Sequence, residues 1–294
     1  MSPRHNAWRG IALVCLTVLL FSFMETLVKY LSRFYPPPML VWARYSVHAV
    51  LAILLIAPHV GRDGMLRTRQ PGAHLLRGIA LVVSTLFFFS GLKFLPQAVC
   101  SAIGFAFPLL VTALSVYWLN EHVTWSRWLA VLCGFAGVLA IIRPGGEAYT
   151  HAALLPLCSA LCYAVYQIMT RQMSKTENAH TMLFYPALVG ALGLLVVLPF
   201  NWVVPGLHHI PLIVAVGAIG ATGHFLLIRA LRVAPASLLA PFSYTQLLWV
   251  GLLGWLVFGD VPDAWSLTGM ATVVASGIFV GIMETRERTL RVAS

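Results

Sequence analysis

Continuous apolar runs of roughly 20 residues follow one another along the whole chain, and few folds accommodate such a pattern. A helix of about 20 apolar residues spans the roughly 30 Å hydrocarbon core of a bilayer, whereas the alternating polarity of an outer-membrane barrel is absent. Hydrophobic residues make up 60% of the 294 residues and charged residues only 10%, too few to cover a water-facing surface. The sequence therefore predicts an all-α polytopic membrane protein with ten transmembrane helices, near residues 9–31, 38–57, 73–92, 97–118, 126–142, 152–170, 180–200, 210–229, 235–258 and 265–283.

The basic residues indicate how these helices are oriented. With the N-terminus in the cytoplasm, 14 of the 19 Lys and Arg residues fall on the cytoplasmic side, 4 fall on the other side and Arg44 falls within a helix. This imbalance follows the positive-inside rule, and it accounts for the net charge of +10 without a nucleic-acid partner. We therefore expect a monomeric, multi-pass protein of the cell inner membrane, embedded in the lipid bilayer, with both termini in the cytoplasm.

An internal repeat runs through the chain. The segment GLKFLPQAV resembles the later segment ALRVAPASL at an offset of 139 residues, which pairs Pro96 with Pro235. The same offset pairs Glu121 with Asp260. Each proline is placed to open a helix, where its missing N–H is not needed. Each acidic residue follows a predicted helix, and we expect it to cap the next helix or to hold the hairpin.

The number of helices in each copy of the repeat determines the topology. Five helices are an odd number, so the second copy must enter the membrane from the side opposite to the first. Inverted repeats are typical of secondary transporters, whose substrate site lies near the midplane between the halves. We therefore predict two inverted five-helix repeats, residues 1–145 and residues 146–294, the second ending in a short cytoplasmic tail.

Two long patterns carry a resemblance to a known family. GLKFLPQAVCSAI followed by WLNEHVTWSRWLAVLCGFAGVLAIIRPG, with the echo ALRVAPASLLAPF and FGDVPDAWSLTGMATVVASGIFVG, resembles the EamA domain from about Trp8 to Met283. Two such domains make up the ten-helix members of the drug/metabolite transporter (DMT) superfamily, and the chain looks similar to the YddG-type amino-acid exporters. The resemblance implies a cavity lined by predicted helices 1, 3, 4, 6, 8 and 9. The second copy departs from the first by placing Pro241 early in its fourth helix, where the first has Pro108 in mid-helix.

Glu25 lies within the first predicted helix, where an ionisable side chain is costly and usually faces a cavity or a partner. Lys29 follows one turn later, at a spacing that favours an ion pair, and Arg44 of the second helix should lie at a similar depth. Both cations are therefore candidates for an ion pair with Glu25. Its role stays open between a structural clamp and a cavity carboxylate that meets a substrate amine or a coupled proton.

Other polar and aromatic residues are candidates for the cavity wall. Gln167 takes the place of Glu25 when Arg171 is aligned with Lys29, and the 139-residue offset pairs positions in helices 4 and 9. The substrate-binding candidates are Glu25, Ser101, Gly104, Phe105, Tyr163, Gln167, His224, Ser243, Tyr244 and Gln246, with Arg44 and Lys29 in structural or coupling roles. Helix packing is the alternative role for each of them, and Ser84, Thr85 and Phe88 are weaker candidates.

Two features of the sequence predict packing, not binding. Gly217, Gly220 and Gly223 recur at every third position, so one face of the eighth helix should approach a neighbouring helix closely. Arg77 opens the third helix, and we expect its side chain to reach the membrane interface.

The residues available for the cavity favour a particular class of cargo. Few fixed charges among neutral polar and aromatic side chains suit an amino acid better than a phosphorylated sugar. We predict a secondary-active or facilitative transporter that exports small metabolites, above all amino acids including aromatic ones, by alternating access. Import of riboflavin, a purine or another metabolite is the alternative. An enzyme is not expected, because the acidic residues are scattered and no P-loop, GxSxG or HExxH motif is present; no catalytic residue, cofactor or metal site is predicted.

Overall fold

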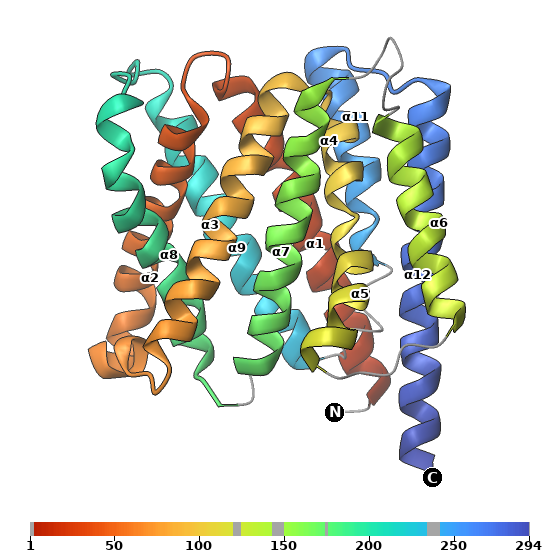
Figure 1. Cartoon of the computed structure of the whole chain (residues 1–294). Coiled ribbons are helices and arrows are strands. Elements are labelled where there is room, and N and C mark those ends of the chain that lie inside the picture. Colours follow the sequence, from red (N-terminus) through yellow and green to blue (C-terminus); the bar gives the residue numbers. More distant parts are fainter. Residues whose placement is uncertain (1–2, 120–124, 143–149, 174–175, 234–241, 294) are drawn as a thin grey trace.

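The computed structural model describes residues 3–119, 125–142, 150–173, 176–233 and 242–293, and this part of the chain contains helices and no strand (Figure 1). Glu121, Pro235 and Pro241 lie outside the described residues, as does the side chain of Arg171. The helices are α1 (Pro3–Leu31), α2 (Pro37–Leu66), α3 (Pro71–Phe94), α4 (Gln97–Gly104), α5 (Phe107–Leu119), α6 (Trp125–Ile142), α7 (Leu154–Met173), α8 (Ala179–Gly193), α9 (Ile210–Val233), α11 (Gln246–Phe258) and α12 (Ala264–Ala293). Short 3-10 turns occupy His151–Ala153, Leu194–Val196 and Leu198–Phe200.

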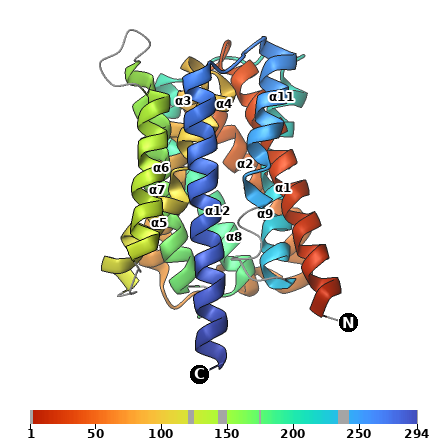
Figure 2. The ribbon, with the colours of Figure 1, turned by 90° about the vertical axis from the view of Figure 1, so that its right-hand side faces the viewer.

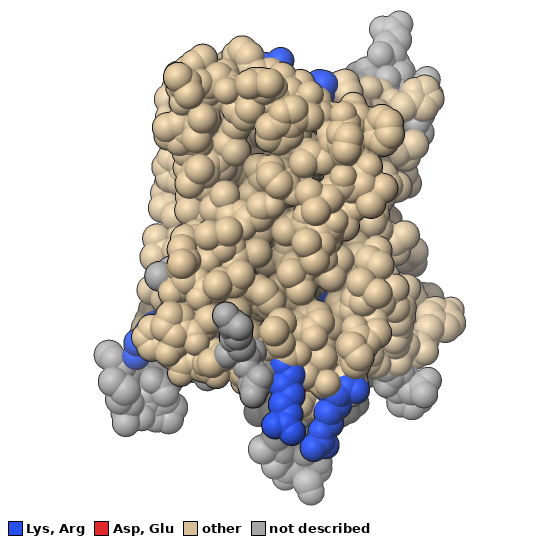
Figure 3. Space-filling view, turned by 90° about the vertical axis from the view of Figure 1, so that its left-hand side faces the viewer, with Lys and Arg blue, Asp and Glu red and all other residues tan. Residues whose placement is uncertain are grey.

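The lengths of the helices fit a membrane. Within the described residues, 6 helical segments are long and apolar enough to cross a bilayer, and 4 shorter apolar helices complete the series. Together they follow the order of the ten predicted helices, which confirms the prediction of an all-α polytopic protein. The face shown in Figure 3 consists almost entirely of uncharged side chains, with Lys and Arg gathered mainly at the end where the termini lie.

The fourth predicted helix is broken in two. α4 ends at Gly104 and α5 begins at Phe107, with Phe105 in the turn between them. Pro108 accounts for the break, because it lacks an N–H for the Gly104 carbonyl and its ring would clash with that carbonyl. The ninth helix breaks at the matching place: α11 begins at Gln246, 139 residues after Phe107.

Each main contact between a helix of the first half and a helix of the second has a counterpart in which the two halves have changed places. α1 packs along α9 as α3 packs along α7, and α2 meets α9 as α3 meets α8. The remaining large contacts join α2 to α8 and α6 to α12, each helix with its counterpart in the other half. α1 runs away from the end that holds the termini, whereas α7 runs towards it (Figure 1). Such an arrangement is that of two inverted copies.

Glycines allow the closest of these contacts. A Cβ on Gly217 would overlap the side chain of Val47 in α2, and a Cβ on Gly223 would overlap the ring of Phe21 in α1. The predicted close approach of this face is therefore confirmed. α6 and α12, which run side by side in Figure 2, meet in the same way, because a Cβ on Gly137 would lie 2.9 Å from the Gly269 carbonyl oxygen.

Arg77 does not reach the membrane interface, and that prediction is wrong. Its side chain is only 1% exposed, because α7 and α8 cover this part of α3. The guanidinium donates from Nη1 to Thr170 Oγ1 at 3.2 Å and from Nη2 to the Met182 carbonyl, and it lies 5.3 Å from the centre of the Tyr166 ring. Arg77 therefore joins the two halves near the end that holds the termini.

Candidate functional site

A cavity of about 250 Å³ lies between the two halves of the bundle. Its walls come from α1, α3, α4, α7, α9 and the start of α11, the helices expected from the sequence, with further contributions from α2 and α5. Nine of the ten predicted binding residues line it: Glu25, Ser101, Gly104, Phe105, Tyr163, Gln167, His224, Ser243 and Gln246. The tenth, Tyr244, is buried behind the wall, where its ring packs on Phe105 at 5.1 Å between centroids.

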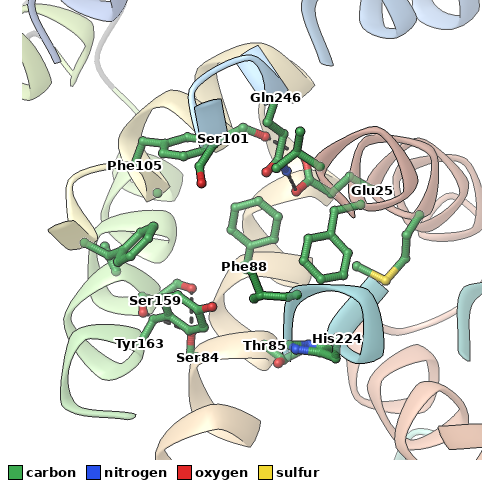
Figure 4. A pocket seen from close by; sticks show the side chains of 18 of the residues that line it. Glu25, Ser84, Thr85, Phe88, Ser101, Phe105, Ser159, Tyr163, His224 and Gln246 are labelled. Atoms are coloured by element: carbon green, nitrogen blue, oxygen red, sulfur yellow. Dashed lines mark hydrogen bonds between the residues drawn. The ribbon is translucent and has the colours of Figure 1, made fainter. Parts of the chain in front are cut away.

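Glu25 lies at the upper end of the cavity in Figure 4 and is held by two neutral groups. Ser101 Oγ donates to its Oε2 and Gln246 Nε2 donates to its Oε1, each at 2.7 Å. The helix breaks explain these partners, because they bring the last turn of α4 and the first residue of α11 to the same level of α1. Neither of the candidate ion pairs of Glu25, with Lys29 or with Arg44, therefore forms.

Lys29 points away from the cavity and pairs with a residue of the other half. Its Nζ lies 2.6 Å from Asp260 Oδ2 and donates to the Leu95 carbonyl oxygen at 2.7 Å. Of the two roles expected for Asp260, capping of α12 is wrong, because Asp263 does this by accepting from the Ser266 N–H at 2.9 Å. One turn beyond Glu25, the long lysine side chain reaches the loop that follows α11 more easily than it reaches back to the carboxylate.

Arg44 lines the cavity from α2 and is 5% exposed. Its Nη1 donates to Thr85 Oγ1 at 3.1 Å, and its Nη2 lies 3.1 Å from His224 Nε2. Since arginine can only donate, His224 accepts through Nε2. The described part of the chain gives Arg44 no salt bridge.

Beyond Glu25, α1 is held to α4 of its own half and to the segment after α11 of the other half. Thr26 Oγ1 lies 3.0 Å from Gln97 Oε1, and Gln97 Nε2 donates to the Ser22 carbonyl oxygen at 3.2 Å. The Lys29–Asp260 pair lies one turn further along α1. In the opposite direction the wall of the cavity continues down α1 as far as Val14. The contacts beyond Glu25 lie towards the C-terminal end of α1, at the end of the bundle opposite the termini (Figures 1 and 2).

Aromatic rings form much of the remaining wall. Phe107 meets Tyr163 edge to face at 4.9 Å, and Phe88 lies in the middle of the view in Figure 4. Ser84 Oγ and Ser159 Oγ approach to 3.0 Å across α3 and α7. The cavity thus offers one carboxylate, one guanidinium, several hydroxyl and amide groups and a set of flat apolar surfaces.

Three polar residues in or beside the cavity were not predicted from the sequence: Thr17 and Ser159 line it, and Gln97 is buried beside it. Ser159 stands four residues before Tyr163 and eight before Gln167, so helical spacing alone places the three on one face. Gln97 is fully buried directly after Pro96. A single amide side chain in an otherwise apolar segment could have indicated that it has a buried hydrogen-bond partner. In the described residues no group of three or more His, Cys, Asp and Glu side chains is placed to hold a metal ion.

Comparisons with known proteins find transporters of similar sequence. The model of the EamA-like transporter family matches residues 8–143 and 150–282. A riboflavin transporter of Vibrio cholerae is 31% identical, over 98% of this chain and 97% of its own length. An S-adenosylmethionine uptake transporter of Rickettsia bellii is 25% identical over 96% and 97%. The pseudopaline exporter CntI of Pseudomonas aeruginosa is 28% identical over 92% and 94%.

A solved structure supports the arrangement of the helices. One crystal structure superposes with a TM-score of 0.67 and covers 94% of this chain and 98% of its own, at 21% sequence identity. At that identity the likeness concerns the fold alone.

Proposed function

This chain belongs to the EamA-like transporter family of the DMT superfamily, and from that premise we propose that it exports amino acids, including aromatic ones, by alternating access. The observation that carries the proposal is the cavity between the halves, with Glu25, Arg44 and aromatic rings in its wall. Its volume of about 250 Å³ favours a small metabolite, since pockets for drug-sized ligands measure about 300–1,000 Å³.

The charges in the wall favour an amino acid over a phosphate ester. Recognition of phosphate calls for clustered donors from Arg or Lys, and Arg44 is the one such residue that lines the cavity in the described part of the chain. An amino acid carries one positive and one negative charge, and the wall holds one residue of each sign, Arg44 and Glu25. The rings of Phe88, Phe105 and Tyr163 would receive its side chain.

Alternating access in this proposal is a movement of residues 1–145 against residues 146–294. The Lys29–Asp260 pair would hold the halves together at the end opposite the termini, and would separate when that end opens. The gathering of Lys and Arg at the other end supports a cytoplasmic location for the termini, in a monomer of the inner membrane (Figure 3).

Import of riboflavin is the second candidate. It is favoured by the name of the 31%-identical relative and by the aromatic rings, on which a flat ring system could stack.

Counterflow into proteoliposomes distinguishes the two candidates. We expect purified protein to accelerate saturable counterflow of labelled amino acids, with phenylalanine among the best, and to leave riboflavin and purines near the rate of empty liposomes. A pH gradient applied in the same assay reports whether protons are coupled. Saturable flux of riboflavin or purines with none of any amino acid would overturn the assignment of cargo.

A further inference from the structure

We propose that a groove between α1 and α9 binds the phosphate group of an anionic phospholipid, in the leaflet on the side of the termini. The groove is lined by Arg9 and Leu13 of α1 and by Arg229 and Val233 of α9, around a volume of about 280 Å³. None of these four residues lines the cargo cavity. The inference therefore goes beyond the proposed function and does not depend on which cargo is transported.

The packing of α1 against α9 brings the two arginines near each other. The helices run side by side in opposite directions (Figures 1 and 2). A Cβ on Gly223 would overlap the ring of Phe21. Seven residues later in α9, Ala230 packs with Val14, which lies seven residues earlier in α1. In this register the arginines are offset by about six residues, or roughly 9 Å along the helices, a gap that two long arginine side chains can close.

Both arginines lie on the side of their helix that faces lipid. Leu16 and Phe23 follow Arg9 at intervals of seven residues, and both are exposed although they are apolar. On α9 the exposed Phe225 precedes Arg229 by four residues, and the guanidinium carbon lies 4.9 Å from the centre of the Phe225 ring. Residues at these spacings share one face of a helix. The groove therefore opens towards the bilayer and not towards the space between the halves.

The groove lies at the depth of the lipid headgroups. The apolar span of α1 begins at Trp8, directly before Arg9. The apolar span of α9 ends at Leu227, two residues before Arg229. Trp8 is exposed, as is usual for tryptophan at the interface between membrane and water. Both guanidinium groups thus stand where the bilayer changes from acyl chains to phosphate groups.

The protein does not neutralise these two charges. The two salt bridges within the described residues involve neither Arg9 nor Arg229. Guanidinium groups bind phosphate oxygens through paired hydrogen bonds, and basic pockets between helices at the cytoplasmic face of a membrane attract anionic headgroups. The other two residues of the groove, Leu13 and Val233, are apolar and can contact acyl chains, which inorganic phosphate lacks. These features favour a phospholipid over free phosphate.

The groove also crosses the boundary between the halves. Arg9 lies in the first of the two EamA-like regions and Arg229 lies in the second. A phosphate bound by both would hold α1 against α9 at the end of the bundle where the termini lie.

Energy transfer from tryptophan to a dansyl-labelled phosphatidylglycerol, measured on the full-length protein in detergent, tests this site. In the unmodified protein, unlabelled phosphatidylglycerol should displace the probe at least about tenfold more strongly than phosphatidylcholine, whose choline group cancels the charge of its phosphate. Inorganic phosphate should not displace it. One basic residue near a membrane surface contributes about fivefold to lipid affinity. Arg9→Gln combined with Arg229→Gln should therefore weaken binding of the probe by about 25-fold.

A matched pair of substitutions separates the groove from the general positive charge of this end. Arg67→Gln combined with Arg69→Gln removes two exposed arginines beyond α2, and its affinity for the probe should stay within about twofold of the unmodified protein. An equal loss in the two double variants would overturn the inference. So would equal displacement by phosphatidylglycerol and phosphatidylcholine in the unmodified protein, a result that requires no variant to fold. Displacement by inorganic phosphate as strong as by phosphatidylglycerol would overturn the assignment to a lipid.

Discussion

Replacing Lys29 with alanine is expected to slow counterflow by about tenfold. The side chains of Lys29 and Asp260 are only 12% and 25% exposed, so removal of the cation leaves a carboxylate without its charge partner at the contact between the halves. Loss of roughly 1.4 kcal/mol from the closed arrangement lowers its population about tenfold, and breaking a fully buried pair removes more than that. A transporter that cannot hold this end closed completes fewer cycles.

Exchange of the two charges makes this test specific. Lys29→Asp combined with Asp260→Lys should recover most of the rate that either single substitution loses, because the pair is restored with its charges reversed. Lys93→Ala is the matched control, since it removes an exposed lysine from α3 at the same end. Full activity of Lys29→Ala, or a double variant no faster than the single ones, would show that the pair does not hold this end closed.

Replacing Arg77 with alanine is expected to cost about 2–5 kcal/mol of stability, the range for removal of a large buried side chain. The same change withdraws donors from Thr170 and from the Met182 carbonyl, so polar groups of α7 and α8 lose their partners as well. For a chain of this size we expect the apparent Tm in detergent to fall by about 5–15 °C.

The comparison with Arg67 isolates the effect of burial. Arg67→Ala removes the same side chain from an exposed position beyond α2, and its Tm should stay within about 2 °C of the unmodified protein. Arg77→Lys should fall between the two, because lysine keeps the charge but not the planar set of donors. Equal Tm values for the two alanine variants would contradict the role assigned to Arg77.

The sequence was sufficient to predict the helices and most of the cavity wall. Runs of apolar residues predict membrane helices because the bilayer sets their length. The constant offset of the repeat pairs the fourth helix with the ninth, and the structure breaks both at matching positions. Gly104 and Phe105 on one side, and Ser243 on the other, were chosen from that offset, and all three line the cavity.

The partners of the charged residues could not be predicted in the same way. Spacing along one helix favours Glu25 with Lys29, but its partners Ser101 and Gln246 are 76 and 221 residues away and come from α4 and α11. Arg77 was misplaced for a similar reason: its burial depends on α7 and α8, which a local pattern in α3 does not contain. Position within a helix can be read locally, whereas the residue that faces it depends on tertiary packing.

The central claim is that cargo binds in the cavity between the two halves, and labelling of a single cysteine tests it most directly. In a protein whose 5 native cysteines are replaced, Ser159→Cys places a thiol in the cavity wall and Thr176→Cys places one at an exposed position that follows α7. We predict that phenylalanine slows maleimide labelling at position 159, with half of the effect at its KM for counterflow, and leaves labelling at position 176 unchanged. Labelling at position 159 that is indifferent to a transported amino acid would contradict the account.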